Sequence, residues 1–453
     1  MVFIDGFGQT RRHVRNGRMS SVSRARDRGR RLGFLCVIGV GLMSMLGVQP
    51  AGAQDADGRM IAVEGEGARY WPRWRGPSGQ GVADGAGYPD RWSATRNVVW
   101  RTTVPGNGNS SPIVWRDQVF LTTSRENGRR LSIMSYRRSD GQLQWETDVP
   151  PGAVERVHRK NTQASSTPTT DGERVYASFG SRGLLAVGLD GTIAWHRELG
   201  RIDNYHGTAG SPLLYRDLVI IYQDHSAGSF VAAFDKASGE PVWRATRQAS
   251  VGWGSPIAVR VDGHDELIVS SERRVTAYDP RTGTELWRCG GNRFEVVPTP
   301  VVGHGLIFCA SGRAGPTLAI RPGGQGDVTT THVVWQTARG APFVPSPIVY
   351  GDYLYTINDM ASVVTCFDAR TGNVMWQERL GRPSREGFSA SPVAFGGKVF
   401  FTNDTGETFV LRAGPAFELL HTNDIGARTL ASPALVDGRW YVRTERELVA
   451  IGH

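Results

Sequence analysis

The sequence predicts an all-β fold, an eight-bladed β-propeller built from four-stranded blades. Two patterns predict it: a Ser/Thr-Pro pair recurs eight times, and a tryptophan recurs at nearly the same interval. Short β-branched or aromatic runs separate them, and about 44 residues with four such runs are typical of one blade. The prolines are Pro112, Pro168, Pro212, Pro256, Pro300, Pro347, Pro392 and Pro433, with spacings of 56, 44, 44, 44, 47, 45 and 41 residues.

Each period reads as four strands in a fixed order. The proline is followed by a short apolar run, a turn, and a second run such as DQVFLTT at 117–123. A third run such as RVTAYD precedes a turn and a tryptophan, as in DPRTGTELW at 279–287. Asp accepts hydrogen bonds from its own downstream backbone, and Gly adopts positive φ. One carboxylate per turn is too few for calcium, so we interpret these aspartates as turn residues.

The recurring tryptophans are expected to dock each blade on the next. An indole can bury about 150–250 Å², and indoles spread around a ring cannot converge into one aromatic cage. In the seventh repeat the position falls near Leu420. The predicted docking residues are Trp100, Trp145, Trp195, Trp243, Trp287, Trp335 and Trp376.

The two ends of the repeat region are expected to share the last blade. The eighth repeat starts at Pro433 and has three runs but no fourth. The run NVVWRTTV at 97–104, around Trp100, offers the missing strand. Pairing this N-terminal strand with the C-terminal blade would close the ring and leave no open blade. We therefore assign residues 97–453 to the propeller.

Residues 1–53 are interpreted as a signal peptide. An Arg-rich stretch precedes an apolar run at 32–48, and AGA at 51–53 offers a small-residue cleavage site. A membrane-anchoring helix is the alternative, although the run is shorter than the about 20 residues that a spanning helix needs. We expect an exported protein, periplasmic or secreted, without a stable transmembrane span after cleavage. Met19 as the start, the export route, and association with the outer membrane stay open.

The charge of the chain is concentrated in this leader. Residues 1–53 contain nine Arg and two Asp, which accounts for most of the formal charge of +9. A nucleic-acid partner is therefore not expected, and we expect a monomer. Residues 54–96, which include YWPRWRGPSGQG at 70–81, are predicted to form a coil that packs on the propeller. The widely spaced Cys289, Cys309 and Cys366 are expected to be buried free thiols.

The candidate binding residues lie in the loops that precede the Ser/Thr-Pro pairs. These loops differ between repeats and would face the central channel. Their polar, cationic and aromatic groups suit an anionic or aromatic ligand. No catalytic residue is predicted, and no metal site, since the two histidines lack a third ligand. The candidates are His158, Lys160, Asn161, Tyr205, His206, Trp253, Arg293, Glu295, Arg385 and Arg428, with Phe343 and Phe388 as further channel aromatics.

The repeat of Ser-Pro, Asp-x-x-Thr-Gly and Trp resembles the pyrroloquinoline-quinone-like (PQQ-like) β-propeller repeat over about residues 97–453. The resemblance brings in quinoprotein dehydrogenases, which use PQQ, calcium and an aspartate base. Alcohol-oxidising members have adjacent cysteines, which this chain lacks. No family catalytic residue is therefore carried over and no cofactor is expected, with PQQ and calcium kept as the alternative.

The sequence thus favours an exported, non-catalytic propeller that serves as a ligand-binding or protein-interaction scaffold in the cell envelope. Its partner would be an unidentified small molecule or an envelope protein. One alternative is a PQQ-dependent quinoprotein oxidoreductase acting on alcohols or sugars. A second is an assembly-type propeller, similar to the propeller lipoprotein of the outer-membrane barrel-assembly machinery. A sugar- or polyol-binding propeller is the third.

Overall fold

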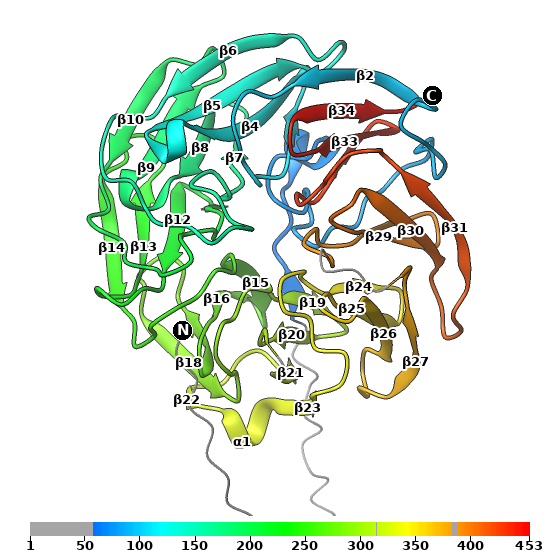
Figure 1. Cartoon of the computed structure of the whole chain (residues 1–453). Helices are drawn as coiled ribbons and strands as arrows, with labels where there is room; N and C mark the ends of the chain where they lie inside the picture. Colours follow the sequence, from blue (N-terminus) through cyan, green and yellow to red (C-terminus); the bar gives the residue numbers. More distant parts are fainter. Residues whose placement is uncertain (1–57, 314, 383–386) are drawn as a thin grey trace, which may run out of the picture. The chain divides into compact units, whose positions relative to one another are not determined.

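Eight sheets, each built on four antiparallel strands, are arranged in a ring (Figure 1). The computed structural model describes residues 58–313, 315–382 and 387–453, all within one compact unit, Ala53–His453. The predicted eight-bladed propeller of four-stranded blades is confirmed. The predicted signal peptide lies outside the described residues.

The first strand of each sheet is the innermost, because first strands contact one another around the ring, as β3 and β32 do. Blades are numbered here along the chain. Blade 1 contains β3 (Ile113–Trp115), β4 (Gln118–Arg125), β5 (Arg130–Arg137) and β6 (Leu143–Asp148); blade 2, β7 (Thr169–Thr170), β8 (Arg174–Ser178), β9 (Leu184–Gly188) and β10 (Ile193–Arg197); blade 3, β11 (Leu213–Tyr215), β12 (Leu218–Gln223), β13 (Phe230–Asp235) and β14 (Pro241–Thr246); blade 4, β15 (Ile257–Val261), β16 (His264–Ser270), β17 (Arg274–Tyr278) and β18 (Glu285–Gly290).

The second half of the ring repeats this order. Blade 5 contains β19 (Val301–Gly303), β20 (Leu306–Ala310), β21 (Thr317–Ile320) and β23 (Val333–Thr337); blade 6, β24 (Ile348–Tyr350), β25 (Tyr353–Asn358), β26 (Val363–Asp368) and β27 (Val374–Arg379); blade 7, β28 (Val393–Phe395), β29 (Lys398–Thr402), β30 (Glu407–Arg412) and β31 (Leu419–Asp424); blade 8, β32 (Ala434–Val436), β33 (Arg439–Arg443), β34 (Glu447–Ile451) and β2 (Val98–Thr103).

Blade 8 closes the ring with strands from both ends of the repeat region. Strand β2 pairs antiparallel with β34, and Trp100 lies opposite Ala450. The predicted closure is confirmed, and it leaves no blade with an open edge at this seam.

The hydrophobic core lies between blades rather than inside any one of them. Val175 and Leu185 of blade 2, for example, share one buried cluster with Ile113 and Phe120 of blade 1. Equivalent clusters join each following pair around the ring. Each blade is therefore stabilised by its two neighbours.

The tryptophan of one blade contacts the turn before the last strand of the next. Trp243 Nε1 donates to the Pro280 carbonyl at 3.1 Å. Its ring covers Gly283, where a Cβ would come within 2.4 Å of Trp243 Cε3. Glycine also permits the φ of 73° at this turn. The same indole-to-carbonyl bond joins Trp100 to Arg138, Trp145 to Leu189, Trp195 to Lys236, Trp335 to Ala369 and Trp376 to Gly414.

Trp287 differs because blade 5 replaces the short turn with a longer insertion. The insertion contains β22 (Gly326–Asp327), which pairs parallel with β18 at Trp287, and α1 (Thr329–His332). Trp287 is fully buried in a cluster shared with blade 5, and its Nε1 donates to Glu266 Oε2 at 2.9 Å. Trp287 therefore bonds to a carboxylate and not to a turn carbonyl, because blade 5 lacks the repeated short turn.

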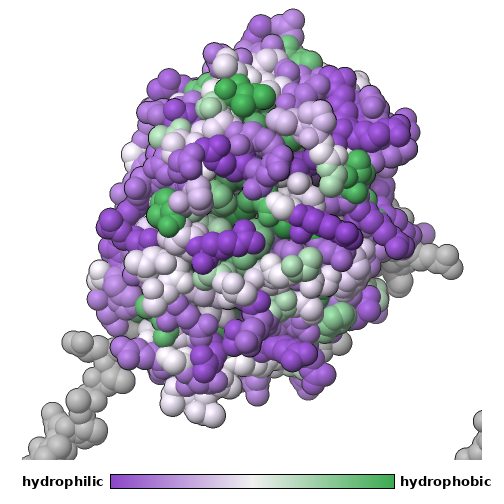
Figure 2. Space-filling view, turned by 90° about the vertical axis from the view of Figure 1, so that its left-hand side faces the viewer, coloured by the Kyte–Doolittle hydropathy of each residue, from purple (hydrophilic) through white to green (hydrophobic). Residues whose placement is uncertain are grey.

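One side of the ring carries many polar side chains. Figure 2 shows hydrophilic side chains over most of one side, with separate small hydrophobic patches. Cys289, Cys309 and Cys366 are buried free thiols on β18, β20 and β26, as the sequence predicts. Burial raises the pKa of the Cys366 thiol to about 12, so this thiol stays protonated.

Candidate ligand-binding site

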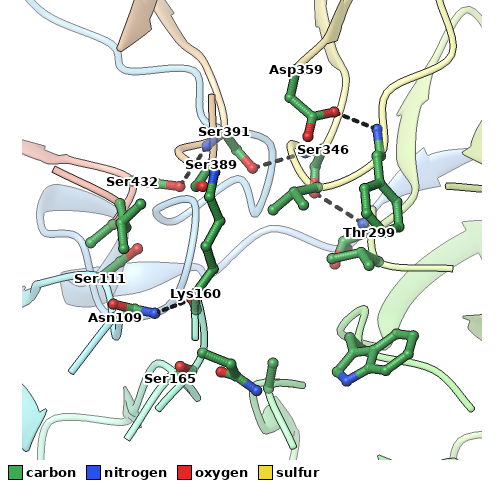
Figure 3. A pocket seen from close by; sticks show the side chains of 18 of the residues that line it. Asn109, Ser111, Lys160, Ser165, Thr299, Ser346, Asp359, Ser389, Ser391 and Ser432 are labelled. Atoms are coloured by element: carbon green, nitrogen blue, oxygen red, sulfur yellow. Dashed lines mark hydrogen bonds between the residues drawn. The ribbon is translucent and has the colours of Figure 1, made fainter. Parts of the chain in front are cut away.

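A belt of serine and threonine hydroxyls lines the channel where the inner strands begin. Each belongs to a Ser/Thr-Pro pair, and from Thr167 to Ser432 each accepts from the backbone N–H of the equivalent residue one blade earlier. Thr299 N–H donates to Ser346 Oγ, and Ser346 N–H to Ser391 Oγ, both at 2.9 Å (Figure 3). These hydroxyls accept hydrogen bonds from backbone N–H groups that lie just before the inner strands, outside the hydrogen-bonding pattern of the sheets. The same bond runs from Ser111 to Thr167, Thr167 to Ser211, Ser211 to Ser255, Ser255 to Thr299 and Ser391 to Ser432.

A cavity of about 730 Å³, the central cavity, lies inside this belt. Its wall combines the belt with the loops that precede the Ser/Thr-Pro pairs, and it reaches Trp74 of the N-terminal segment. Met360, which is 72% exposed, also lines it, so the cavity opens to the surface at that end. The volume is within the range of small-molecule sites.

The N-terminal segment crosses the channel beneath the belt. Trp71 exchanges two backbone hydrogen bonds with Val114 of blade 1. Gln80 bonds both backbone groups of Val302 in blade 5, on the opposite side of an eight-bladed ring. The segment contains β1 (Arg59–Met60), which pairs with β15, and η1 (Gly65–Arg69). Trp74 therefore forms the floor of the central cavity.

Four rings cluster on one wall of the cavity. His158 and His206 lie 4.7 Å apart between ring centroids, and His206 lies 5.8 Å from Trp253. Tyr205 packs behind them, 4.3 Å from His206 and 5.7 Å from Trp253. Trp253 Nε1 donates to the Gly207 carbonyl at 2.8 Å, which fixes the indole. The cluster offers flat apolar faces to a ring-shaped ligand.

A chain of polar contacts supports this wall. Tyr205 donates its hydroxyl to Glu295 Oε1 at 2.7 Å, and Glu295 Oε2 lies 3.2 Å from Arg313 Nε. The Arg313 guanidinium lies 5.2 Å from the ring centre of Phe343, which lines the cavity. Burial and the Glu295 carboxylate raise the pKa of Tyr205. Tyr205 and Glu295 thus hold the cavity residues in place without lining the cavity themselves.

Lys160 joins two sides of the ring. Its Nζ lies 2.6 Å from Asp404 Oδ2, although the two residues are 244 positions apart. In Figure 3 its side chain runs across the pocket toward Ser389, whose hydroxyl donates to the same Asp404 oxygen at 3.1 Å. Burial raises the pKa of Asp404, and Lys160 opposes that shift. A buried carboxylate of this kind needs its cation.

Two further groups give the cavity acid–base character. Asp359 lines the wall with only 7% of its surface exposed, and its Oδ1 accepts from Phe343 N–H at 2.8 Å. Burial raises the pKa of Asp359. Burial, His206 and Arg159 lower the pKa of His158, so this imidazole is neutral near pH 7.

The structure brings together only part of the predicted set. Of the remaining candidates, Arg293 is exposed and lines neither this cavity nor its neighbour, Phe388 is buried, and Tyr205 and Glu295 pack behind the wall. Phe388 packs 6.0 Å from Phe409 in the core between blades 6 and 7, where its ring loses more contact with water than in a polar channel. Arg385 lies outside the described residues. His158, Lys160, Asn161, His206, Trp253 and Phe343 line the central cavity, and Arg428 lines a smaller neighbouring one.

Sequence reasoning missed several wall residues. Asn109 precedes its Ser/Thr-Pro pair like the other candidates and could have been found. Asp359 follows β25 directly, and Asp404 comes two residues after β29, so aspartates after a second strand were the missed signal. Trp74 has no repeat position, but it lies in the segment 70–81 that the sequence predicts to pack on the propeller, for which a ligand-binding arm is the alternative.

The sequence profile described as "Outer membrane protein assembly factor BamB" matches residues 91–226, 227–359 and 359–451. These ranges cover most of the chain. The chain belongs to the BamB-type family of PQQ-like β-propellers.

Two relatives of known name resemble this BamB-type propeller. It is 20% identical over 345 residues to a tetrathionate hydrolase of Acidithiobacillus ferrooxidans, covering 68% of this chain and 65% of the relative. It is 26% identical over 200 residues to BamB of Burkholderia pseudomallei, covering 42% and 47%. The BamB-type chain therefore spans less than two thirds of the length of either relative.

Solved structures share the fold. BamB of Moraxella catarrhalis superposes with a TM-score of 0.58 at 16% identity, over 78% of this BamB-type chain and 96% of that one. The quinohemoprotein alcohol dehydrogenase of Comamonas testosteroni gives 0.60 at 13% identity, over 85% and 81%. At these identities the likeness concerns the fold alone. In the described part of this BamB-type chain, every helix is too short or too polar to span a membrane.

A calcium-bound quinone does not fit the described residues of this BamB-type site. Nowhere in residues 58–313, 315–382 and 387–453 do three or more His, Cys, Asp or Glu gather to hold a metal. Asp404 is engaged by Lys160, and Asp359 accepts from backbone. The three described cysteines lie on three different strands, so they form no adjacent pair. We derive no step through a quinone.

Proposed function

We propose that this chain is an exported propeller that binds a small organic ligand in its central cavity. The observation that carries the proposal is the cavity of about 730 Å³, lined by Trp74 of the crossing N-terminal segment and by the hydroxyl belt. Small-molecule sites are concave and combine apolar faces with a few fixed polar groups. The role is binding, without catalysis.

The wall indicates the general form of the ligand. Trp253, His206 and Phe343 offer ring faces, while Asn161 and the belt offer hydrogen-bonding groups. A ligand with a flat or ring-shaped body and polar substituents would use both, as an aromatic acid or a sugar does. The relative named tetrathionate hydrolase acts, by its name, on a small molecule, which supports a small-molecule role.

A thermal-unfolding screen tests the proposal. Monosaccharides, polyols and aromatic carboxylates are added to the purified chain, because a ligand that binds only the folded state raises the unfolding midpoint. Phe343→Leu and His206→Ala should weaken the shift from any hit. Phe294→Leu is the matched control, since Phe294 is 50% exposed and does not line the cavity. A screen without hits, or a shift that Phe343→Leu and His206→Ala leave unchanged, contradicts the proposal.

Export is part of the proposal. It is supported by the leader-like residues 1–53 and by the BamB-type family, whose printed name refers to the outer membrane. The test is mass spectrometry of the mature N-terminus in fractionated cells. A protein that begins near Gln54 in the envelope fraction supports export, whereas an uncleaved cytoplasmic chain contradicts it.

A second candidate is a protein-interaction scaffold in outer-membrane assembly, favoured by the family match over most of the chain. Crosslinking in the cell envelope, followed by identification of the captured proteins, tests it. Repeated capture of outer-membrane assembly proteins supports this role. Their absence, together with a hit in the ligand screen, favours the binding role.

A further inference from the structure

A second cavity of about 190 Å³, the side cavity, adjoins the central cavity. The two share part of their walls. The side cavity lies between the loop at 107–109, which precedes blade 1, the loop before blade 8, and the turn from β33 to β34 of blade 8. The shared residues are Asn109, Arg159, Lys160, Asn161, Leu430 and Ala431.

Cations outnumber acids around the side cavity. Among the described residues, its lining includes Arg159, Lys160, Arg428 and Arg443 but only one carboxylate, Glu445. Glu445 Oε1 lies 3.8 Å from Arg428 Nη1, a long contact for an ion pair. Lys160 is neutralised by Asp404. The positive charge of Arg159 and Arg443 therefore stays uncompensated by the carboxylates of this wall.

Arg443 is buried and has no acidic partner in the part of the chain that the structure describes. Only 2% of its surface is exposed. Its Nη1 donates to Ser110 Oγ at 2.6 Å and to the Thr122 carbonyl at 2.7 Å, and both partners are neutral. Its Nε is buried and finds no hydrogen-bond partner among residues 58–313, 315–382 and 387–453. Burying a guanidinium among neutral hydrogen-bond partners costs free energy, because the charge loses its hydration. An anion beside Arg443 would therefore be stabilising.

Gly108 makes room for this guanidinium. A Cβ at residue 108 would lie 2.2 Å from Arg443 Nη2 and 2.8 Å from its Cζ. Gly108 also lines the side cavity. The loop before blade 1 thus lets Arg443 reach the cavity wall.

We propose that the side cavity binds the anionic group of a small organic ligand, a carboxylate, sulfonate or phosphate, whose body occupies the central cavity. The inference rests on the proposed function and narrows its ligand class to organic anions. Arginine matches such groups because its planar fork presents several N–H donors at once. Arg443, buried in the wall of the side cavity, supplies one fixed N–H donor. The exposed Arg159, which lines both cavities, supplies another.

Calorimetry with inorganic sulfate, in chloride buffer of constant ionic strength, tests the anion site alone. We expect saturable binding that Arg159→Ala weakens about tenfold, the cost of one charge-assisted contact. Arg443→Gln should weaken it further, provided that circular dichroism shows a folded chain. Arg281→Ala removes an exposed charge from an outer blade turn and should have no effect. Sulfate binding that is absent, or indifferent to Arg159→Ala, overturns the inference.

A second pair of probes separates this inference from the proposed function. Naphthalene-2-sulfonate should bind at least tenfold more tightly than uncharged 2-naphthol, and Arg159→Ala should reduce that difference. Equal binding of both probes overturns the anion site but leaves the central cavity as a ligand site. Sulfate binding that depends on Arg159, with neither naphthalene bound, supports the anion site and counts against the proposed central ligand.

Discussion

The backbone N–H of Ser255 donates to Thr299 Oγ1 at 2.8 Å across the boundary between blades 4 and 5. Thr299 is 2% exposed, and its hydroxyl is the acceptor that this backbone N–H of the half-buried Ser255 uses. Thr299→Val keeps the shape but removes the acceptor, and we expect a loss of about 1–3 kcal/mol in the free energy of unfolding. Thr299→Ser should cost less, because it keeps the hydroxyl. Urea unfolding of both variants gives the comparison, and equal stabilities would contradict a role for the bond.

Because Trp243 packs directly on Gly283, a side chain at residue 283 should clash with the indole and lower the stability of the fold. Gly283→Ala introduces a Cβ 2.4 Å from the indole at a φ of 73°. Gly263→Ala is the control, since its φ is 86° but nothing lies within 4 Å of the new Cβ. In both variants the left-handed backbone conformation should lower the free energy of unfolding by about 1–2 kcal/mol. In Gly283→Ala, overpacking against the indole should lower it by about 1–3 kcal/mol more. Similar unfolding midpoints for the two variants would refute the docking contact.

The ion pair between Lys160 and Asp404 should matter more than other pairs of its type. Lys160→Met leaves a fully buried carboxylate without its cation, and we expect a loss of about 3 kcal/mol in the free energy of unfolding. Adding Asp404→Asn should recover part of it. Lys236→Met is the control, because Lys236 pairs with Asp171 at 2.8 Å but Asp171 also accepts from backbone N–H groups. Equal losses in the two Lys→Met variants would argue against a special role for burial.

Asp359 should make stability depend on pH. Burial raises its pKa in the folded state, so its contribution is complete below about pH 3.9 and is lost as the pH rises through the folded value. Asp359→Asn removes this loss and keeps the acceptor for Phe343 N–H. The unfolding midpoint of Asp359→Asn, relative to wild type, should therefore rise between pH 4 and pH 7.

Asp368→Asn supplies the control of opposite sign for that experiment. A hydrogen bond from Thr371 lowers the pKa of Asp368, so its contribution is present above about pH 3.9 and is lost at lower pH. The midpoint of Asp368→Asn, relative to wild type, should fall as the pH rises. A parallel pH dependence in both variants would contradict the assignment of these two shifts.

The blade count and the ring closure could be predicted because the repeat imposes local constraints. Each Ser/Thr-Pro pair begins an inner strand, and each Gly such as Gly283 permits a turn that an indole covers. Because successive blades need the same residues at these positions, the residues recur in the sequence at the spacing of the blades. The insertion at 321–332 interrupts them and gave no comparable signal, since only the packing around Trp287 shows how the gap is filled.

The site was predictable in position but not in detail. The loops before the Ser/Thr-Pro pairs do contribute His158, His206 and Trp253 to the cavity. Which side chain of each loop faces the channel depends on tertiary packing, and the local sequence does not reveal it. Phe343 lines the cavity, whereas Phe388 is buried in the core between two blades. The floor at Trp74 comes from a segment without repeats.

The crossing N-terminal segment gives the channel a single entrance. A ligand that rests on Trp74 would enter and leave past the exposed Met360, because the N-terminal segment spans the channel between blades 1 and 5. Dissociation therefore retraces the path of association. A protein that covered this rim would stop exchange altogether, and it would hold the ligand for as long as the two proteins stayed bound.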